Sequence, residues 1–331
     1  MAIDPSDTNH VLLGTDNGLL VTRNGGLDWQ AAINGPSGPV FAVAVDPDGR
    51  QLTATDRGLF RSDAGDNWNP LPPLSGVTPA RALVAGRQSG RVYLLGWRGL
   101  FRSDDWGTTW ARLDAGLPDA SATSMVVLPT AAGDESLVCL VGGQVWAGDS
   151  TGHDWHRQSE GLPDAQMQVV ALDPSADVLW AAGADRVFRS DTAGRVWQAV
   201  GQPLPDPATD IRGIVASPDR RLVLSTHRGV YTTVDGGSTW SALTDNLPGH
   251  IEAGPLLRDP VETQTLYIGF AITPYDEQWR RVADGRSGGG RLSLPDVVGG
   301  LAFLLLVALG AGLALQWLAR RQPPHVAEPV A

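Results

Sequence analysis

The sequence predicts an all-β protein: a seven-bladed β-propeller, with six blades as the alternative, followed by one C-terminal transmembrane α-helix. Three observations support this prediction. A tryptophan-containing motif occurs six times at steps of 39 to 45 residues, and a fixed period of this size indicates a repeat architecture. Each repeat contains four short apolar or β-branched runs separated by turn residues. One long apolar run follows the last repeat.

The repeated motif is clearest at residues 233–240 and 103–110, where it reads Ser/Thr-x-Asp-x-Gly-x-Thr-Trp. An Asp or Asn in the third position can accept hydrogen bonds from backbone N–H groups further along the turn, and the glycine supplies a positive φ. The tryptophan then begins the next strand and lays a large apolar ring over the blade. The motif therefore predicts a tight turn before the last strand of each blade.

The other copies vary, but all six keep a glycine three residues before the tryptophan. The copy at 22–29 has Asn in the Asp position, the copy at 61–68 keeps its Asp but loses the leading hydroxyl, and the copies at 148–155 and 190–197 have diverged further. We expect structural roles for Asn24, Gly26, Trp29, Asp63, Gly65, Trp68, Asp105, Gly107, Trp110, Gly152, Trp155, Gly194, Trp197, Asp235, Gly237 and Trp240.

The second repeat shows the strand order best. Runs at 40–45, 51–55, 59–62 and 68–71 alternate with turn residues such as Asp46-Pro47-Asp48-Gly49, and four short antiparallel strands make one propeller blade. The seventh repeat is degenerate. It keeps strand-like runs at 266–271 and 279–282, but residues 274–277 replace the motif. We expect the propeller to occupy residues 1–283.

A Gly/Ser-rich linker is predicted at 284–295, a transmembrane helix at 296–318 and a short polar tail at 319–331. Residues 297–315 contain no charged side chain, and a helix of that length spans most of a bilayer core of about 30 Å. Trp317 suits the membrane interface, and Arg320 with Arg321 suits a cytoplasmic end. The lipid bilayer is thus one expected partner.

We expect the propeller to be extracytoplasmic and the tail cytoplasmic. Several arginines before the apolar run favour the opposite orientation, so a tail-anchored cytoplasmic protein remains the alternative. Residues 1–5 align with residues 43–47, which places Met1 inside the innermost strand of a blade. This alignment favours a further segment upstream of Met1.

Composition excludes several classes of function. The net charge is −11 and all 25 basic residues are arginine, so no nucleic-acid partner is expected. The single cysteine, Cys139, rules out a disulfide framework and a multi-cysteine metal site. His153 and His156 have no further ligands at a metal-binding spacing. We therefore expect neither a metal nor a cofactor.

The candidate binding residues occupy the turn between the second and third strands, on the face opposite the motif turns. Four repeats place an arginine there: Arg57, Arg98, Arg186 and Arg228. Asn17 and Gln144 fill the position in two other repeats. An arginine ring would offer planar, bidentate docking for an anion or carboxylate. The alternative is that arginine is simply tolerated at a solvated hairpin tip.

The motif resembles the Asp-box (BNR) repeat of sialidase-like β-propellers, and the chain is also similar to assembly-factor propellers of the Ycf48/HCF136 type. The resemblance implies that the Asp-box turns lie away from the ligand-binding face. It also implies a non-catalytic propeller that binds a protein or glycan partner at the membrane surface, as an assembly or scaffold factor. The predicted C-terminal anchor departs from that family.

The enzymatic alternative is a sialidase-like exo-glycosidase acting on extracellular glycans. The resemblance would then require an arginine triad, an acid/base Asp and a tyrosine nucleophile assisted by a glutamate. Tyr275 with Glu277 is the one candidate pair, in the degenerate repeat. The Phe/Tyr-Arg-Ile-Pro sequence of that family is absent, so the sequence favours a function without catalytic residues.

Overall fold

A computed structural model describes residues 1–271, except 64, 66, 119–120, 165–166, 174–176, 184, 206–209, 218–220 and 244–251. These residues belong to one compact unit and fold entirely into β-strands and connections. Within this described part, no helix has the length and hydropathy needed to cross a membrane. The predicted linker, transmembrane helix at 296–318 and tail lie outside it.

Six four-stranded antiparallel sheets follow one another along the chain, each with its strands in sequence order. The first three blades comprise β1 (Ala2–Ile3), β2 (Val11–Thr15), β3 (Gly18–Thr22) and β4 (Gln30–Ala31); β5 (Val40–Val45), β6 (Gln51–Thr55), β7 (Gly58–Ser62) and β8 (Asn69–Pro70); and β9 (Ala82–Ala85), β10 (Val92–Gly96), β11 (Gly99–Ser103) and β12 (Ala111–Arg112).

The next three blades repeat the arrangement. They comprise β13 (Ala122–Pro129), β14 (Glu135–Val141), β15 (Gln144–Asp149) and β16 (His156–Arg157); β17 (Val169–Asp173), β18 (Val178–Gly183), β19 (Arg186–Ser190) and β20 (Gln198–Val200); and β21 (Ile211–Ala216), β22 (Leu222–Thr226), β23 (Gly229–Thr233) and β24 (Ser241–Leu243).

The seventh repeat departs from the prediction of seven blades. Its described residues form a two-stranded sheet, β25 (Glu252–Arg258) with β26 (Leu266–Ala271), and the predicted strand at 279–282 lies outside the described part. Six complete blades, the alternative considered above, are therefore what the structure shows. In the sequence, residues 274–277 stand where the other repeats have the Asp-box motif.

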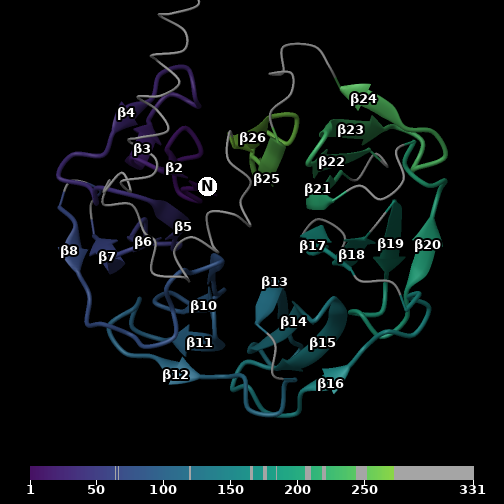
Figure 1. Cartoon of the computed structure of the whole chain (residues 1–331), viewed down its shortest axis with the longest axis horizontal. Helices are drawn as coiled ribbons and strands as arrows, with labels where there is room; N and C mark the ends of the chain where they lie inside the picture. Colours follow the sequence, from purple (N-terminus) through teal and green to yellow (C-terminus); the bar gives the residue numbers. More distant parts are fainter. Residues whose placement is uncertain are drawn as a thin grey trace, which may run out of the picture. The chain divides into compact units, whose positions relative to one another are not determined.

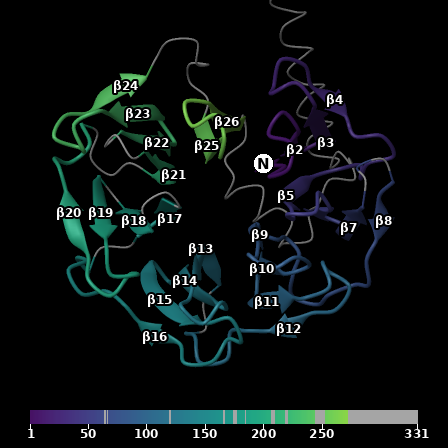
Figure 2. The same cartoon turned by 180° about the vertical axis from the view of Figure 1, so that it is seen from behind.

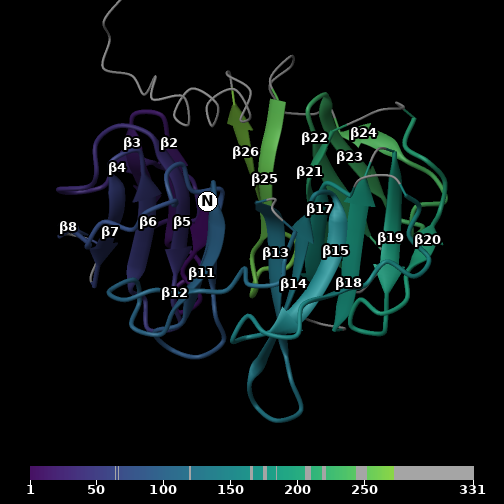
Figure 3. The same ribbon diagram turned by 60° about the horizontal axis from the view of Figure 1, so that its bottom comes forward.

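The sheets are arranged in a ring with the first strand of each blade nearest the centre (Figure 1). Seen from behind, β9 and β10 follow β5 round the ring in the same order (Figure 2). The two-stranded sheet lies between the sixth and first blades. Viewed from the side, the strands run between the two ends of the propeller (Figure 3).

Burial falls from the middle of each blade to its outer edge. The second strands β6, β10, β18 and β22 are buried at every residue, whereas the fourth strands β4, β8, β12 and β16 are exposed at every residue. The second strands are correspondingly rich in Leu, Val, Ala and Thr, because a strand covered on both faces reads as a continuous apolar run.

The hydrophobic core is divided among the spaces between blades. One cluster joins Leu52 of the second blade to Leu94 and Trp106 of the third, and similar clusters join the other neighbouring sheets. Between the last sheet and the first blade, a Cβ added at Gly26 would lie 3.4 Å from Cε1 of Tyr267 in β26. The two-stranded sheet thus contacts the first Asp-box turn as well as the sixth blade.

Candidate functional site

The six Asp-box turns share one end of the propeller with the turns between first and second strands, because all blades have the same strand order. We call this end the Asp-box face and the other end, which carries the turns between second and third strands, the hairpin face. In the sixth box, Asp235 accepts hydrogen bonds from the Thr233 hydroxyl (2.7 Å), the Thr239 N–H (2.9 Å) and the Thr239 hydroxyl (2.8 Å). The Gly237 N–H donates to the Thr233 hydroxyl at 2.9 Å.

The third and first boxes repeat this pattern. Asp105 accepts from Ser103, the Thr109 N–H and the Thr109 hydroxyl, and Asn24 accepts from the Thr22 hydroxyl and from the N–H of residue 28. In the sixth box, hydrogen bonds from Thr233 and Thr239 lower the pKa of Asp235 to about 2. The side-chain oxygens of these Asp and Asn residues therefore serve to stabilise the turn.

Three boxes hold the same turn by other means. In the second box, Ser62 accepts the Gly65 N–H at 2.8 Å, so the hydroxyl missing at Arg61 is present one residue later, and the prediction that it was lost is wrong. In the fifth box, the Thr192 hydroxyl replaces the carboxylate and accepts the N–H of residue 196 at 2.8 Å. In the fourth, Asp149 accepts the N–H of His153 at 2.9 Å.

Several box tryptophans fasten one blade to the preceding one. The indole N–H of Trp155 donates to the Leu113 carbonyl (2.7 Å), that of Trp197 to the Gln158 carbonyl (3.3 Å) and that of Trp240 to the Gln202 carbonyl (2.9 Å). Each acceptor lies just after the last strand of the preceding blade. In these three boxes the tryptophan joins two adjacent blades.

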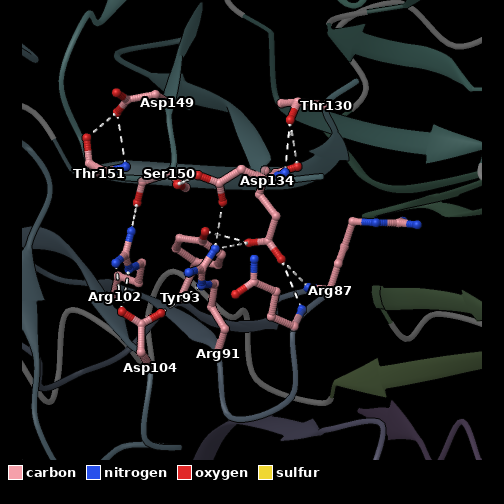
Figure 4. A network of polar contacts seen from close by, with 12 residues as sticks. Arg87, Arg91, Tyr93, Arg102, Asp104, Thr130, Asp134, Asp149, Ser150 and Thr151 are labelled. Carbon is pink, nitrogen blue, oxygen red and sulfur yellow. Dashed lines mark hydrogen bonds and ion pairs between the residues drawn. The ribbon is translucent and has the colours of Figure 1, made fainter. Parts of the chain in front are cut away.

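A polar network joins the third and fourth blades beneath the Asp-box face (Figure 4). The Arg91 guanidinium lies between Asp104 (2.7 Å) and Asp134 (3.0 Å) and is 3.5 Å from Glu135. The Tyr93 hydroxyl donates to Glu135 at 2.6 Å. Glu135 also accepts the backbone N–H groups of residues 87 and 88, while the Arg87 side chain points away from the network (Figure 4).

This network contains a tyrosine–glutamate pair, the combination a sialidase-like enzyme would use, but its surroundings do not fit that role. Tyr93 is 0% exposed and Glu135 is 2% exposed, so neither can reach a substrate. Burial, followed by the hydrogen bond to Glu135, raises the pKa of Tyr93 far above its ordinary value, which leaves the phenol protonated. Tyr275 and Glu277, the pair considered above, lie outside the described residues.

On the hairpin face, a threonine at the end of the second strand holds the turn. Thr55 Oγ1 accepts the Arg57 N–H (3.0 Å) and donates to the Gly58 carbonyl (2.9 Å), and Thr226 makes the same two bonds to Arg228 and Gly229 (3.1 and 2.9 Å). The following glycine has a φ of 121° at Gly58, a value that favours glycine. The arginine is thereby placed at the exposed tip of the hairpin.

Register divides the four predicted arginines into three and one. Arg57, Arg98 and Arg228 each precede the glycine that closes the hairpin, whereas Arg186 itself pairs with Gly183 and opens β19. Arg186 therefore occupies the position of that glycine, one residue later than predicted. Gln144 is displaced in the same way, since it pairs with Val141, and Gly142 and Gly143, with φ of 59° and 74°, form the turn.

All four arginine side chains are exposed. Arg57 Nη1 donates to Ser37 at 3.2 Å. Arg98 and Arg186 have no carboxylate partner among the residues that the structure describes. Asp56 directly precedes Arg57, and Asp185 directly precedes Arg186. The hairpin face therefore offers separate positive charges rather than one continuous basic surface.

Two further features lie on the hairpin face. The Arg81 guanidinium lies over the Trp97 ring, 5.1 Å from its centroid, beside Arg98. His227, next to Arg228, is bonded through Nδ1 to the Asp210 N–H at 2.9 Å. The sequence signal for both was an aromatic or histidine residue immediately before the arginine of the turn.

No family model and no curated protein matches the sequence. Solved structures do resemble it. Ycf48 bound to D1 peptide has a TM-score of 0.60 and 17% identity over 81% of this chain and 87% of its own. Ycf48 from Cyanidioschyzon merolae has a TM-score of 0.62 and 14% identity over 81% and 91%.

The extracellular domain of a one-component system, BT4673 from B. thetaiotaomicron, has a TM-score of 0.63 and 12% identity over 81% of this chain and 36% of its own. At these identities the likeness concerns the fold and not the ligand. The chain has the β-propeller fold of Ycf48 and of BNR-type propeller domains.

Proposed function

We propose that this chain is a non-catalytic β-propeller, anchored in a membrane by residues 296–318, that binds an acidic segment of a protein partner through its hairpin face. One observation carries the proposal: Arg57, Arg98 and Arg228 stand at the same position of three blades, exposed at the tip of a turn, on a protein of net charge −11. Arg186 adds a fourth charge one residue away.

Two features of the structure support this use of the hairpin face. The Asp-box residues are occupied in holding turns and joining blades, whereas the arginine side chains extend into solvent. An exposed guanidinium offers a planar fork of donors that matches a carboxylate. Ycf48, a solved propeller of the same fold, is bound to a peptide. We therefore favour a protein partner over a glycan.

The test uses acidic peptides and matched peptides in which Asn and Gln replace Asp and Glu. Binding to the full chain is measured by fluorescence anisotropy at low and high salt. We expect acidic peptides to bind more tightly, and the double substitution Arg57→Glu with Arg98→Glu to abolish the difference. The matched control is Arg195→Glu, an exposed arginine of the Asp-box face. Equal binding by the double variant would refute the proposal.

The proposed orientation places the propeller outside the cytoplasm and the tail inside. Protease protection on membranes expressing the gene with its upstream DNA tests this. Digestion of the propeller from the outside is expected. Digestion only from the inside would identify a tail-anchored cytoplasmic protein, and hydrolysis of a fluorogenic sialoside would refute a non-catalytic function.

A further inference from the structure

His227 and Arg228 form the tip of the β22–β23 hairpin, and the imidazole is held in place from two blades. The Asp210 N–H donates to His227 Nδ1 at 2.9 Å, and the His227 N–H donates to the Asp210 carbonyl at 3.0 Å. Gln168, just before β17 of the neighbouring blade, donates to the Asp210 carboxylate at 3.0 Å and accepts the Ile211 N–H at 2.7 Å. The ring therefore has a fixed position.

The imidazole also faces a second donor. The Nε–H of Arg228 points at His227 Nε2 from 3.2 Å, so an N–H group is directed at each ring nitrogen. A neutral imidazole has only one acceptor nitrogen. In one of these two contacts, therefore, a protonated ring nitrogen faces another N–H group and no hydrogen bond forms.

The backbone decides which contact is the mismatch. The Asp210 N–H can only donate, and its direction is fixed because the same two residues are paired a second time through the His227 N–H. The Arg228 side chain is exposed, so the backbone does not fix the direction of its Nε–H. Nδ1 is therefore the acceptor, and the proton is on Nε2, where Nε2–H and the arginine Nε–H point toward each other.

We propose that these two N–H groups form a carboxylate-binding subsite on the hairpin face. A carboxylate oxygen that lies beside both groups accepts a hydrogen bond from each and removes the mismatch, and the bond from the guanidinium is charge-assisted. Arg228 also takes part in another interaction, and the subsite requires only its Nε–H. The subsite rests on the proposed function above and specifies the chemistry that this blade recognises, a carboxylate from an acidic side chain or from a chain end.

The first test reads the tautomer without any ligand. Long-range ¹H–¹⁵N spectra of the ¹⁵N-labelled full chain distinguish protonated from unprotonated ring nitrogens in its six histidines, and the variant His227→Gln assigns the signal. We expect His227 to be protonated at Nε2. Protonation at Nδ1 instead would overturn the proposal.

The second test titrates N-acetylglycine, which represents a chain end, and acetylated, amidated aspartate, which represents a side chain, with sodium chloride at equal ionic strength as the comparison. We expect a saturable shift of the His227 Nε2 signal with one or both carboxylates. Arg228→Gln should weaken binding about tenfold, the loss expected for one charge-assisted hydrogen bond. Arg195→Gln, an exposed position on the Asp-box face, should leave it unchanged.

Equal shifts with chloride, or no effect of Arg228→Gln, would overturn the subsite. If acidic peptides still bind in a manner that depends on Arg57 and Arg98, the proposed function stands without it. If the His227 shift is present but that dependence is absent, the subsite is real and the broader proposal fails. The preferred titrant identifies whether a chain end or a side chain is recognised.

Discussion

The buried contact between Tyr93 and Glu135 makes a strong prediction about what holds the third and fourth blades together. Glu135 has a side chain only 1% exposed, accepts hydrogen bonds from Tyr93 and from two backbone N–H groups, and lies 3.5 Å from the Arg91 guanidinium. Glu135→Ala would remove the acceptor from a fully buried phenol and leave a cavity. Such losses cost about 3–5 kcal/mol. Tyr93→Phe removes one bond to a charged group, about 1.5–3 kcal/mol.

Urea denaturation followed by tryptophan fluorescence measures both values. The matched control is Asp134→Asn, whose side chain is 54% exposed where it meets Arg91, so that its change should stay below about 1 kcal/mol. In a double-mutant cycle, the Tyr93→Phe and Glu135→Ala effects should be coupled by about 1 kcal/mol or more. Additive effects, or a loss below about 1 kcal/mol for Glu135→Ala, would refute the reasoning.

Three other predictions concern the Asp-box turns. The pKa of Asp235 is about 2 against a usual 3.8, so the ionised side chain stabilises the fold fully above pH 3.8 and loses that effect as the pH falls through 2; an NMR carboxyl titration with a midpoint near 3.8 would contradict this. Trp106 is fully buried and its indole N–H has no partner among the described residues, so Trp106→Phe should cost less than about 1.5 kcal/mol and Trp106→Ala about 3–5 kcal/mol in thermal unfolding. Trp155→Phe should cost about 1 kcal/mol, because it removes one hydrogen bond between blades; no change in melting temperature would show that the bond is not needed.

The sequence predicts the fold well because the residues that repeat once per blade, those of the Asp-box, form a turn by contacts within the repeat itself. The strands expected at 40–45 and 51–55 match β5 and β6, and the strand expected at 266–271 matches β26. Errors arose where a turn changed length. Ser62 performs the role expected of the residue before it, and Arg186 stands one position later than an alignment on glycines suggested.

The network of Figure 4 was not predictable in the same way, because its partners come from different repeats. Glu135 bonds to Tyr93, 42 residues earlier, and no repeat pattern pairs these residue types. One signal was available: a glutamate at the start of a strand that continues as an apolar run to Val141. A carboxylate in that position requires buried partners, although the sequence does not say which.

The fastening of blades by tryptophan has a consequence for how such a ring can change. Each indole bonds to a main-chain carbonyl, and the residues that supply it, Leu113, Gln158 and Gln202, have unrelated side chains. Substitution at an acceptor position leaves the carbonyl in place. A copied blade that carries this tryptophan would therefore find its acceptor already present next to any of these three positions, without a compensating change of side chain there.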